Sequence, residues 1–271
     1  MINGKTITEL AEARKSIRTY SSKSIPSELM KELENKIAGS SNPFSIPVSF
    51  FILSKDQYDL RSPVLKGETY YIAGKVKKEP YAEEAYGYAM EELVLFLQAN
   101  DLGTVWLGGT FGREAFEKAI GLEADAFMPC VTPFGYPAPK MSLRETLMRK
   151  GVKADTRLPA DQLFFENDFS SPLSPERGTE IAFEAVRLAP SAVNKQPWRI
   201  VRQGSSYHFY LVRSLKESEP DMQKTDMGIA LCHFVLALEE TGIKTEVIIK
   251  DPGISCPENT EYRFTVCTQT A

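Results

Sequence analysis

The hydrophobic and polar positions of the first 150 residues predict short helices separated by strands. Thr6 and Glu9 match a capping box, and an apolar helix face follows as far as Ile17. Pro26 opens a second helix, whose apolar residues recur at four-residue spacing until Gly39 ends it. Apolar runs between turn residues predict strands, and amphipathic runs closed by glycine or asparagine predict helices. The expected strands are 48–53, 69–73, 104–107 and 128–134, and the further helices are 88–97 and 113–120.

The pattern restarts in the last hundred residues, after a charge- and proline-rich stretch at 138–172 that is expected to be irregular. Ser174 and Pro175 are typical of a helix start, with a capping side chain followed by proline at the first helical position. A strand is expected directly after Pro197. The remaining expected elements are a helix over 228–240 that ends at Gly242, and strands at 207–212, 245–249 and 262–267.

The two halves resemble each other in the spacing of their prolines. Pro26 and Pro175 lie 149 positions apart, and Pro47 and Pro197 lie 150 apart. An internal duplication predicts such agreement, although helix–loop–strand units also resemble one another by chance. The predicted division is a first half at 1–150, a connecting arm at 151–172 and a second, shorter half at 173–271.

Composition excludes several classes of protein. The chain is 42% hydrophobic and 25% charged, as is ordinary for a globular protein, and its net charge of −4 argues against nucleic acid as a partner. The first residues lack the apolar run of a signal peptide, and no apolar stretch is long enough to span a bilayer. We therefore expect a cytoplasmic protein with neither a nucleic-acid nor a membrane partner.

Common catalytic fingerprints are absent from the sequence. It contains no GxGxxG, GxxxxGK[ST], HExxH or GxSxG pattern. Its two histidines, His208 and His233, have no metal-ligating neighbour at a suitable spacing, so both are interpreted as structural. Metal catalysis and Ser-His-Asp chemistry are not expected.

A basic run follows the first predicted helix. Arg14, Lys15, Ser16 and Arg18 place three cations and a hydroxyl within five residues, and guanidinium groups with a hydroxyl suit a phosphate. Cations also suit a helix C-terminus, and charge runs are commonly solvated faces. Both interpretations are open for this run alone.

A second cluster lies between two prolines, Pro190 and Pro197. Ser191, Asn194 and Gln196 offer hydrogen-bond donors and acceptors of the kind that read a planar heterocycle and a polyol chain. An ordinary turn between a helix and a strand is the alternative interpretation.

Together these motifs resemble the nitroreductase family of flavoproteins. The resemblance is carried by the run at 14–18, the PSAVNKQPW loop at 190–198 and the stretch Trp106-Leu107-Gly108-Gly109. It implies an α+β fold in which flavin mononucleotide (FMN) lies between two subunits. In this chain the basic run is found only in the first half and the PSxxNxQPW loop only in the second, because the corresponding loop at 41–47 lacks the amide spacing. The chain is therefore similar to a tandem member of the family, with two related halves forming a fused pseudo-dimer around mixed sheets with packed helices.

The resemblance also implies a site and an activity. The residues expected to bind FMN are Arg14, Lys15, Ser16, Arg18, Trp106, Leu107, Gly108, Gly109, Arg157, Pro190, Ser191, Asn194 and Gln196. Lys66 is a candidate for the flavin N1/O2 edge. The expected activity is reduction of one FMN per chain by NAD(P)H, followed by ping-pong transfer to a nitroaromatic or quinone-like acceptor, in a monomer that acts as a pseudo-dimer. A non-catalytic FMN-binding, storage or sensory protein and a flavin-fragmenting or dehalogenating enzyme remain alternatives.

Overall fold

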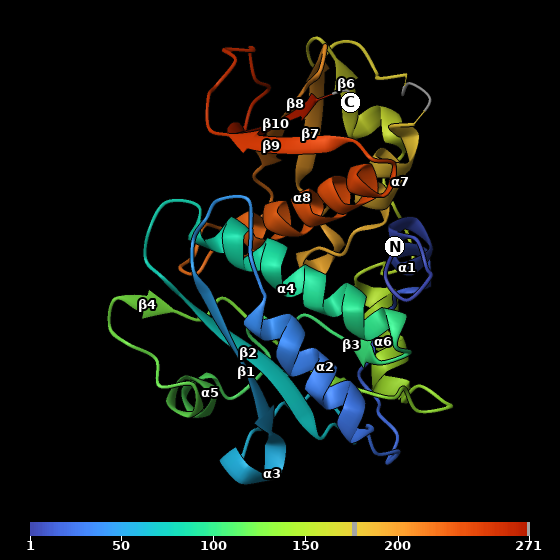
Figure 1. Cartoon of the computed structure of the whole chain (residues 1–271), viewed down its shortest axis with the longest axis vertical. Coiled ribbons are helices and arrows are strands. Elements are labelled where there is room, and N and C mark those ends of the chain that lie inside the picture. Colours follow the sequence, from blue (N-terminus) through green and yellow to red (C-terminus); the bar gives the residue numbers. More distant parts are fainter. Residues whose placement is uncertain (175–177, 270–271) are drawn as a thin grey trace.

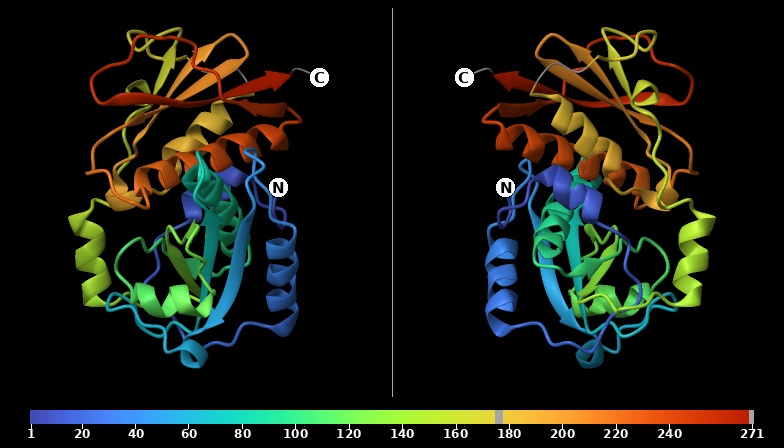
Figure 2. Two further views of the ribbon diagram at one scale, coloured as in Figure 1. Left: turned by 90° about the vertical axis from the view of Figure 1, so that its left-hand side faces the viewer. Right: turned by 90° about the vertical axis from the view of Figure 1, so that its right-hand side faces the viewer.

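The computed structural model describes residues 1–174 and 178–269. Two five-stranded sheets, one formed mainly by each half of the chain, lie on opposite sides of a pair of long helices (Figures 1 and 2). The helices are α1 (Ile7–Ala13), α2 (Ser27–Ala38), α3 (Lys55–Tyr58), α4 (Ala82–Ala99), α5 (Arg113–Ala119), α6 (Leu143–Gly151), α7 (Glu180–Leu188) and α8 (Met222–Glu240), with 3-10 turns η1 (Ala160–Gln162) and η2 (Ala192–Asn194). In the described part of the chain, none of these helices has the length and apolar character needed to cross a bilayer.

The first sheet is antiparallel, in the order β1-β2-β5-β3, with β4 beside β2. Its strands are β1 (Val48–Ser54), β2 (Tyr70–Lys77), β3 (Gly103–Thr104), β4 (Ala126–Phe127) and β5 (Val131–Gly135). The second sheet has the order β6-β7-β8-β10-β9. Its strands are β6 (Phe164–Glu166), β7 (Trp198–Gln203), β8 (Ser206–Val212), β9 (Lys244–Ile248) and β10 (Thr260–Gln269). The pairing is antiparallel except between β6 and β7, which run parallel.

The helices α4 and α8 lie against each other between the two sheets (Figure 1). Two glycines allow their close contact. A Cβ atom on Gly87 would lie 2.1 Å from the carbonyl oxygen of Thr225, and one on Gly228 would lie 2.0 Å from that of Glu84. Gly87 and Gly228 are 141 residues apart, as are Glu84 and Thr225, and the helix ends at Ala99 and Glu240 have the same offset. Only glycine permits so close an approach. The reciprocal contact gives the two halves a pseudo-twofold relation and confirms the predicted α+β fold of two related halves.

Several expectations for elements need correction. The first helix ends at Ala13 instead of continuing to Ile17, because Arg14 takes an extended conformation and the backbone N–H of Ile17 donates to Thr104 O at 2.9 Å. Of the strand expected at 104–107 only Thr104 lies in a strand, β3, and the strand expected at 128–134 begins only at Val131. The stretch at 138–172, expected to be irregular, contains α6, η1 and β6. Because β6 joins the second sheet, this stretch connects the two sheets physically, although the domain boundaries themselves stay a prediction.

The second half begins its first helix later than expected. The helix α7 starts at Glu180, and Pro175, the residue expected to open it, lies outside the described residues. The other elements of this half follow the prediction, and α8 extends the expected helix back to Met222, where the side chain of Asp221 caps it. Asp221 accepts hydrogen bonds from the backbone of Gln223 and Lys224, which satisfies donors at the helix start.

Candidate functional site

A cavity of about 340 Å³ lies between the two halves. Segments far apart in the sequence line it: the basic run, the glycine pair after β3, the arm after α6, the loop before β7 and one face of α8. The residues that line it include Arg14, Ser16, Arg18, Trp106, Leu107, Gly108, Gly109, Met148, Val152, Arg157, Pro190, Ser191, Asn194, Met222, Asp226 and Ile229. Its volume falls within the range of small-molecule sites, roughly 300–1,000 Å³.

The basic run supplies one wall of this cavity. Arg14 is only 8% exposed, and burial lowers its pKa while Glu91 opposes that shift. Burial likewise lowers the pKa of Arg18, against the opposing effect of Glu145. The Nε atoms of both arginines are buried and have no hydrogen-bond partner among the described residues. Arg14 and Arg18 line the cavity together with Ser16, and two guanidinium groups with unsatisfied donors are suited to an anionic ligand such as a phosphate.

The helix α6 holds the basic run in place. The carboxylate of Glu145 accepts from Arg18 N at 2.9 Å and from the Thr19 hydroxyl at 2.8 Å. Arg149, on the same helix, donates to Ser16 O at 3.4 Å and pairs with Asp155. Glu145 and Arg149 therefore hold the backbone of the basic run and do not line the cavity themselves. Met148, which lies between them on α6, does line it.

The loop at 190–197 is fastened to the arm by its own amides. Asn194 Nδ2 donates to Lys153 O at 2.8 Å and to Thr156 O at 3.0 Å. Gln196 Oε1 accepts from Leu158 N at 2.8 Å, and this side chain does not line the cavity. Val193, Asn194 and Gln196 all have positive φ angles, which are costly for residues other than glycine. Hydrogen bonds to the arm thus hold a strained loop in place.

Arg157 couples this loop to the end of α7. Its guanidinium donates to Leu188 O at 3.0 Å through Nη2 and to Asn194 Oδ1 at 3.4 Å through Nη1. Burial, followed by the charge of Arg14, lowers its pKa to about 10. Much of its hydrogen-bonding capacity is used by the protein, so Arg157 contributes charge and support to the cavity.

The opposite lining is mostly apolar. A Cβ atom on Gly108 would lie 2.9 Å from Met222 Sδ, whereas one on Gly109 would meet nothing within 4 Å. The indole of Trp106 donates to Glu91 Oε2 at 3.0 Å, and Glu91 Oε1 lies 2.9 Å from His233 Nε2. Glu91 and His233 come from α4 and α8, so this buried pair links the two halves directly beneath a cavity residue.

The structure brings most of the predicted residues together. Eleven of the thirteen line the cavity, namely Arg14, Ser16, Arg18, Trp106, Leu107, Gly108, Gly109, Arg157, Pro190, Ser191 and Asn194. Lys15 lines a smaller adjoining hollow of about 140 Å³ that shares Arg14 and Arg157, and Gln196 is buried in the loop. The structure therefore joins segments about 175 positions apart, but whether each residue binds FMN stays a prediction.

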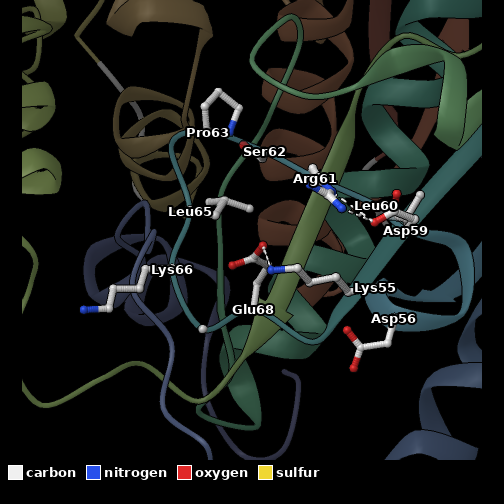
Figure 3. Close-up of a pocket in the computed structure, with 11 residues that line it drawn as sticks. Lys55, Asp56, Asp59, Leu60, Arg61, Ser62, Pro63, Leu65, Lys66 and Glu68 are labelled. Carbon is white, nitrogen blue, oxygen red and sulfur yellow. Dashed lines mark hydrogen bonds and ion pairs between the residues drawn. The ribbon is translucent and has the colours of Figure 1, made fainter.

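Lys66 lies at a different place. It lines a separate hollow of about 790 Å³ formed by the single segment 55–68, in which Lys55 pairs with Glu68 at 2.7 Å and Arg61 with Asp59 at 2.9 Å (Figure 3). The structure does not bring Lys66 to the cavity between the halves. The candidate for the flavin N1/O2 edge is thus not supported.

Several lining residues were not singled out from the sequence. Met222, Asp226 and Ile229 line the cavity from one face of α8, and Met148 and Val152 line it from the arm. Asp226 follows Gln223, Lys224 and Thr225 at the polar start of α8, so the sequence gives no signal that sets it apart. The methionines and aliphatic residues carry no signal either, because such residues are ordinary in any core.

The pseudo-twofold counterpart of the cavity holds aromatic side chains. Phe44 has the loop position of Asn194, offset by 150 residues, and Tyr81, directly before α4, is offset by 141 residues from Met222, the first residue of α8. The rings of Phe44 and Tyr81 stack with centroids 5.6 Å apart, and Phe264 meets Phe44 edge-on at 5.6 Å. Arg263 covers the Tyr81 ring at 5.3 Å and pairs with buried Glu84. The two halves therefore differ in what fills corresponding places.

No group of residues in the described ranges could hold a metal ion by the usual donor clustering. His208 bonds the Thr265 hydroxyl at 2.7 Å and His233 bonds Glu91, as expected for structural histidines. The donors around the cavity are cationic and neutral groups with one carboxyl, a set that suits an anionic organic ligand better than a metal.

Comparison with known proteins gives a family and a fold. A family model described as "Putative TM nitroreductase" matches residues 6–238. A Thermotoga maritima protein described as a putative nitroreductase shares 24% identity, with 97% of this chain and 93% of that chain covered and a TM-score of 0.62. No curated protein matches the chain.

Other solved structures align with about half of this chain. A Bacteroides thetaiotaomicron protein described as a "Putative NADH dehydrogenase/NAD(P)H nitroreductase" shares 23% identity, covering 51% of this chain and 90% of its own, with a TM-score of 0.43. An FMN-dependent nitroreductase of Clostridium difficile shares 14%, covering 52% and 94%, with a TM-score of 0.41. On the match of the family model to residues 6–238, the chain belongs to this nitroreductase family.

Proposed function

We propose that the protein is an FMN-dependent oxidoreductase of the nitroreductase type, which holds one FMN per chain in the cavity between its halves. In this proposal NAD(P)H reduces the flavin, and a nitroaromatic or quinone-like acceptor is reduced in the same cavity by a ping-pong mechanism. The observation that carries it is that Arg14 and Arg18, whose Nε atoms have no hydrogen-bond partner among the described residues, both line a cavity of about 340 Å³.

The donors present fit the parts of FMN. Arg14, Arg18 and Ser16 would hold the phosphate, since guanidinium and hydroxyl donors form short, charge-assisted bonds to phosphate oxygens. The apolar lining by Trp106 and Ile229, with the backbone of Gly109, would contact the flat ring system. Bound flavin would supply the electron-accepting and electron-donating chemistry, so the chain itself needs only to bind, orient and shield the ring.

The proposed stoichiometry follows from the asymmetry of the two halves. The basic run has no equivalent ahead of Ser174, where the sequence reads Phe165-Glu166-Asn167-Asp168-Phe169. On the corresponding side of the molecule, Phe44 and Tyr81 stack where Asn194 and Met222 line the cavity. A second FMN would lack its phosphate donors and would clash with these rings.

The direct test is to titrate the purified apoprotein with FMN and to follow quenching of flavin fluorescence. We expect saturation at one FMN per chain, bleaching of the bound flavin by NADH or NADPH without oxygen, and recovery of colour on addition of a quinone. Parallel double-reciprocal lines would identify the ping-pong order. Saturation at two FMN per chain would contradict the single site. A bound flavin that neither nicotinamide bleaches would contradict the reductase and favour a binding protein.

A further inference from the structure

Asp226 is the one acidic side chain among the described residues that line the cavity. It lies on α8 between Met222 and Ile229, one turn away on either side, and all three line the cavity from the same helix face. Asp226 is 1% exposed, and both of its carboxyl oxygens lie close to Ala192 N, at 3.0 and 3.1 Å. The carboxyl is thus held by the same strained loop that closes the cavity.

The surroundings of Asp226 favour its neutral form. Burial raises the pKa of Asp226 well above its usual range, the Ala192 N–H opposes this shift, and the charge of Asp221 at the start of α8 adds to it. Burial raises the pKa of the Cys130 thiol, before β5, and the charge of Asp226 adds to that shift. Among the described residues, no cation forms an ion pair with Asp226. Arg14, Arg18 and Arg157 are the charged groups on the other elements that line the cavity.

We infer that Asp226 is the proton donor for the acceptor that is reduced in this cavity. The inference rests on the proposed function. A quinone reduced to a hydroquinone gains a hydride equivalent and one proton. Bound flavin would supply the hydride equivalent, and the Asp226 carboxyl would supply the proton, with its O–H bond breaking as the new O–H bond on the acceptor forms. The resulting carboxylate keeps its hydrogen bond from Ala192 N–H and takes a new proton from solvent.

This role gives the carboxyl a function that packing alone does not require. A buried acid without a cationic partner costs stability when it ionises, so a purely structural position is better filled by a neutral amide. A buried acid with a raised pKa that lines a cavity is suited to general acid catalysis. Asp226 is a catalytic residue in this proposal, because it touches the acceptor.

The test compares Asp226→Asn with Asp161→Asn, a change at an exposed aspartate of η1. Flavin-loaded protein is reduced by NADPH and then mixed with a quinone or with ferricyanide, which takes electrons without a proton. We expect Asp226→Asn to slow oxidation by the quinone about 100-fold or more, the usual range for loss of a general acid, and to leave oxidation by ferricyanide unchanged. Reoxidation of wild-type protein by the quinone should slow as pH rises through the Asp226 pKa, and that of the variant should not. Equal slowing with both oxidants would overturn the proposal in favour of a positioning role.

A second readout needs no bound flavin. Because the folded-state pKa of Asp226 is raised, its neutral form contributes stability at low pH that is lost as pH rises through the folded pKa. The amide of Asp226→Asn stays neutral, so the melting temperature of the variant relative to wild type should increase with pH, and that of Asp161→Asn should not. A difference independent of pH would show that Asp226 does not carry the proton. Failure of flavin to bind would remove the proposed function but leave this measurement intact.

Discussion

Replacing Arg14 by methionine tests the phosphate end of the cavity most directly. The methionine keeps an unbranched side chain of similar reach, so the change removes the guanidinium without opening a large space. Arg14 is 8% exposed, its Nε has no partner among the described residues, and the described structure gives its side chain no ion pair. The folded apoprotein therefore has little to lose from the change.

The expected loss appears in ligand binding instead. A hydrogen bond to a charged group contributes about 1.5–3 kcal/mol, and removal of one partner of a buried charged contact costs more. For a guanidinium that bonds a desolvated phosphate we expect about 2–4 kcal/mol, which weakens FMN binding roughly 30- to 700-fold. The free energy of unfolding of the apoprotein should change by no more than about 1 kcal/mol.

The assay is FMN titration by fluorescence quenching, with chemical denaturation of the apoprotein in parallel. Arg61→Met is the matched control, because Arg61 is exposed and its ion pair among the described residues is with exposed Asp59 at 2.9 Å. This control should keep wild-type affinity. If Arg14→Met binds FMN as tightly as wild type does, Arg14 does not contact the phosphate. If it unfolds the apoprotein, the buried cation is structural, and the reasoning from its unsatisfied donor is wrong.

Four further outcomes are expected. Gly228→Ala should destabilise the protein by about 3 kcal/mol or more in denaturant, because its Cβ would lie 2.0 Å from Glu84 O, whereas Gly151→Ala, with open space around it, should not. Glu91→Gln should cost about 1–3 kcal/mol and shift tryptophan fluorescence, because an amide cannot accept from both Trp106 and His233. FMN affinity should fall as pH rises through about 10, where Arg157 loses its charge, and Arg157→Met should show no such fall. Above that pH the unfolded chain binds one more proton at Arg157 than the folded chain does. The free-energy cost of burying Arg157 therefore decreases as pH rises. Phe44→Ala should lower stability by up to about 3 kcal/mol while the titration still saturates at one FMN.

Local signals in the sequence predict most of the elements. The Thr6–Glu9 capping box is present with both hydrogen bonds, and Gly39 ends α2 as predicted. These features depend on neighbours within a few residues, so periodicity and capping chemistry suffice to find them. The same signals fail after Ala13, where the backbone leaves the helix because Ile17 N bonds Thr104, a partner about 90 residues away. Such contacts carry no local signature.

The functional site, like the fold, could be predicted from the sequence only in part. Arg14, Ser16, Arg18 and the loop at 190–194 could be named from their motifs, and they do meet in one cavity. The roles of the amides could not be predicted, because Asn194 and Gln196 have donors and acceptors suited either to a ligand or to backbone, and only the fold shows that the arm uses them. Asp226 was missed because the ionisation of a single acid depends on burial, which a sequence does not display.

Because the two halves are joined in one chain, corresponding positions in them can carry different side chains. In a symmetric pair of identical chains, each surface residue occurs twice, so a side chain that fills one site also fills the other. In this chain the 141-residue offset preserves the Gly87–Gly228 contact, while the positions around it have diverged. Phe44, Tyr81 and Phe264 pack where the counterpart cavity would lie, and aromatic pairs contribute about 0.5–1.5 kcal/mol beyond their buried area. The cavity on one side of the pseudo-twofold relation can then hold the strained loop, the unsatisfied arginines and the buried acid, all contributed by the two halves together, while the counterpart side contributes stability. Removing Phe44 should therefore weaken the fold without creating a second site.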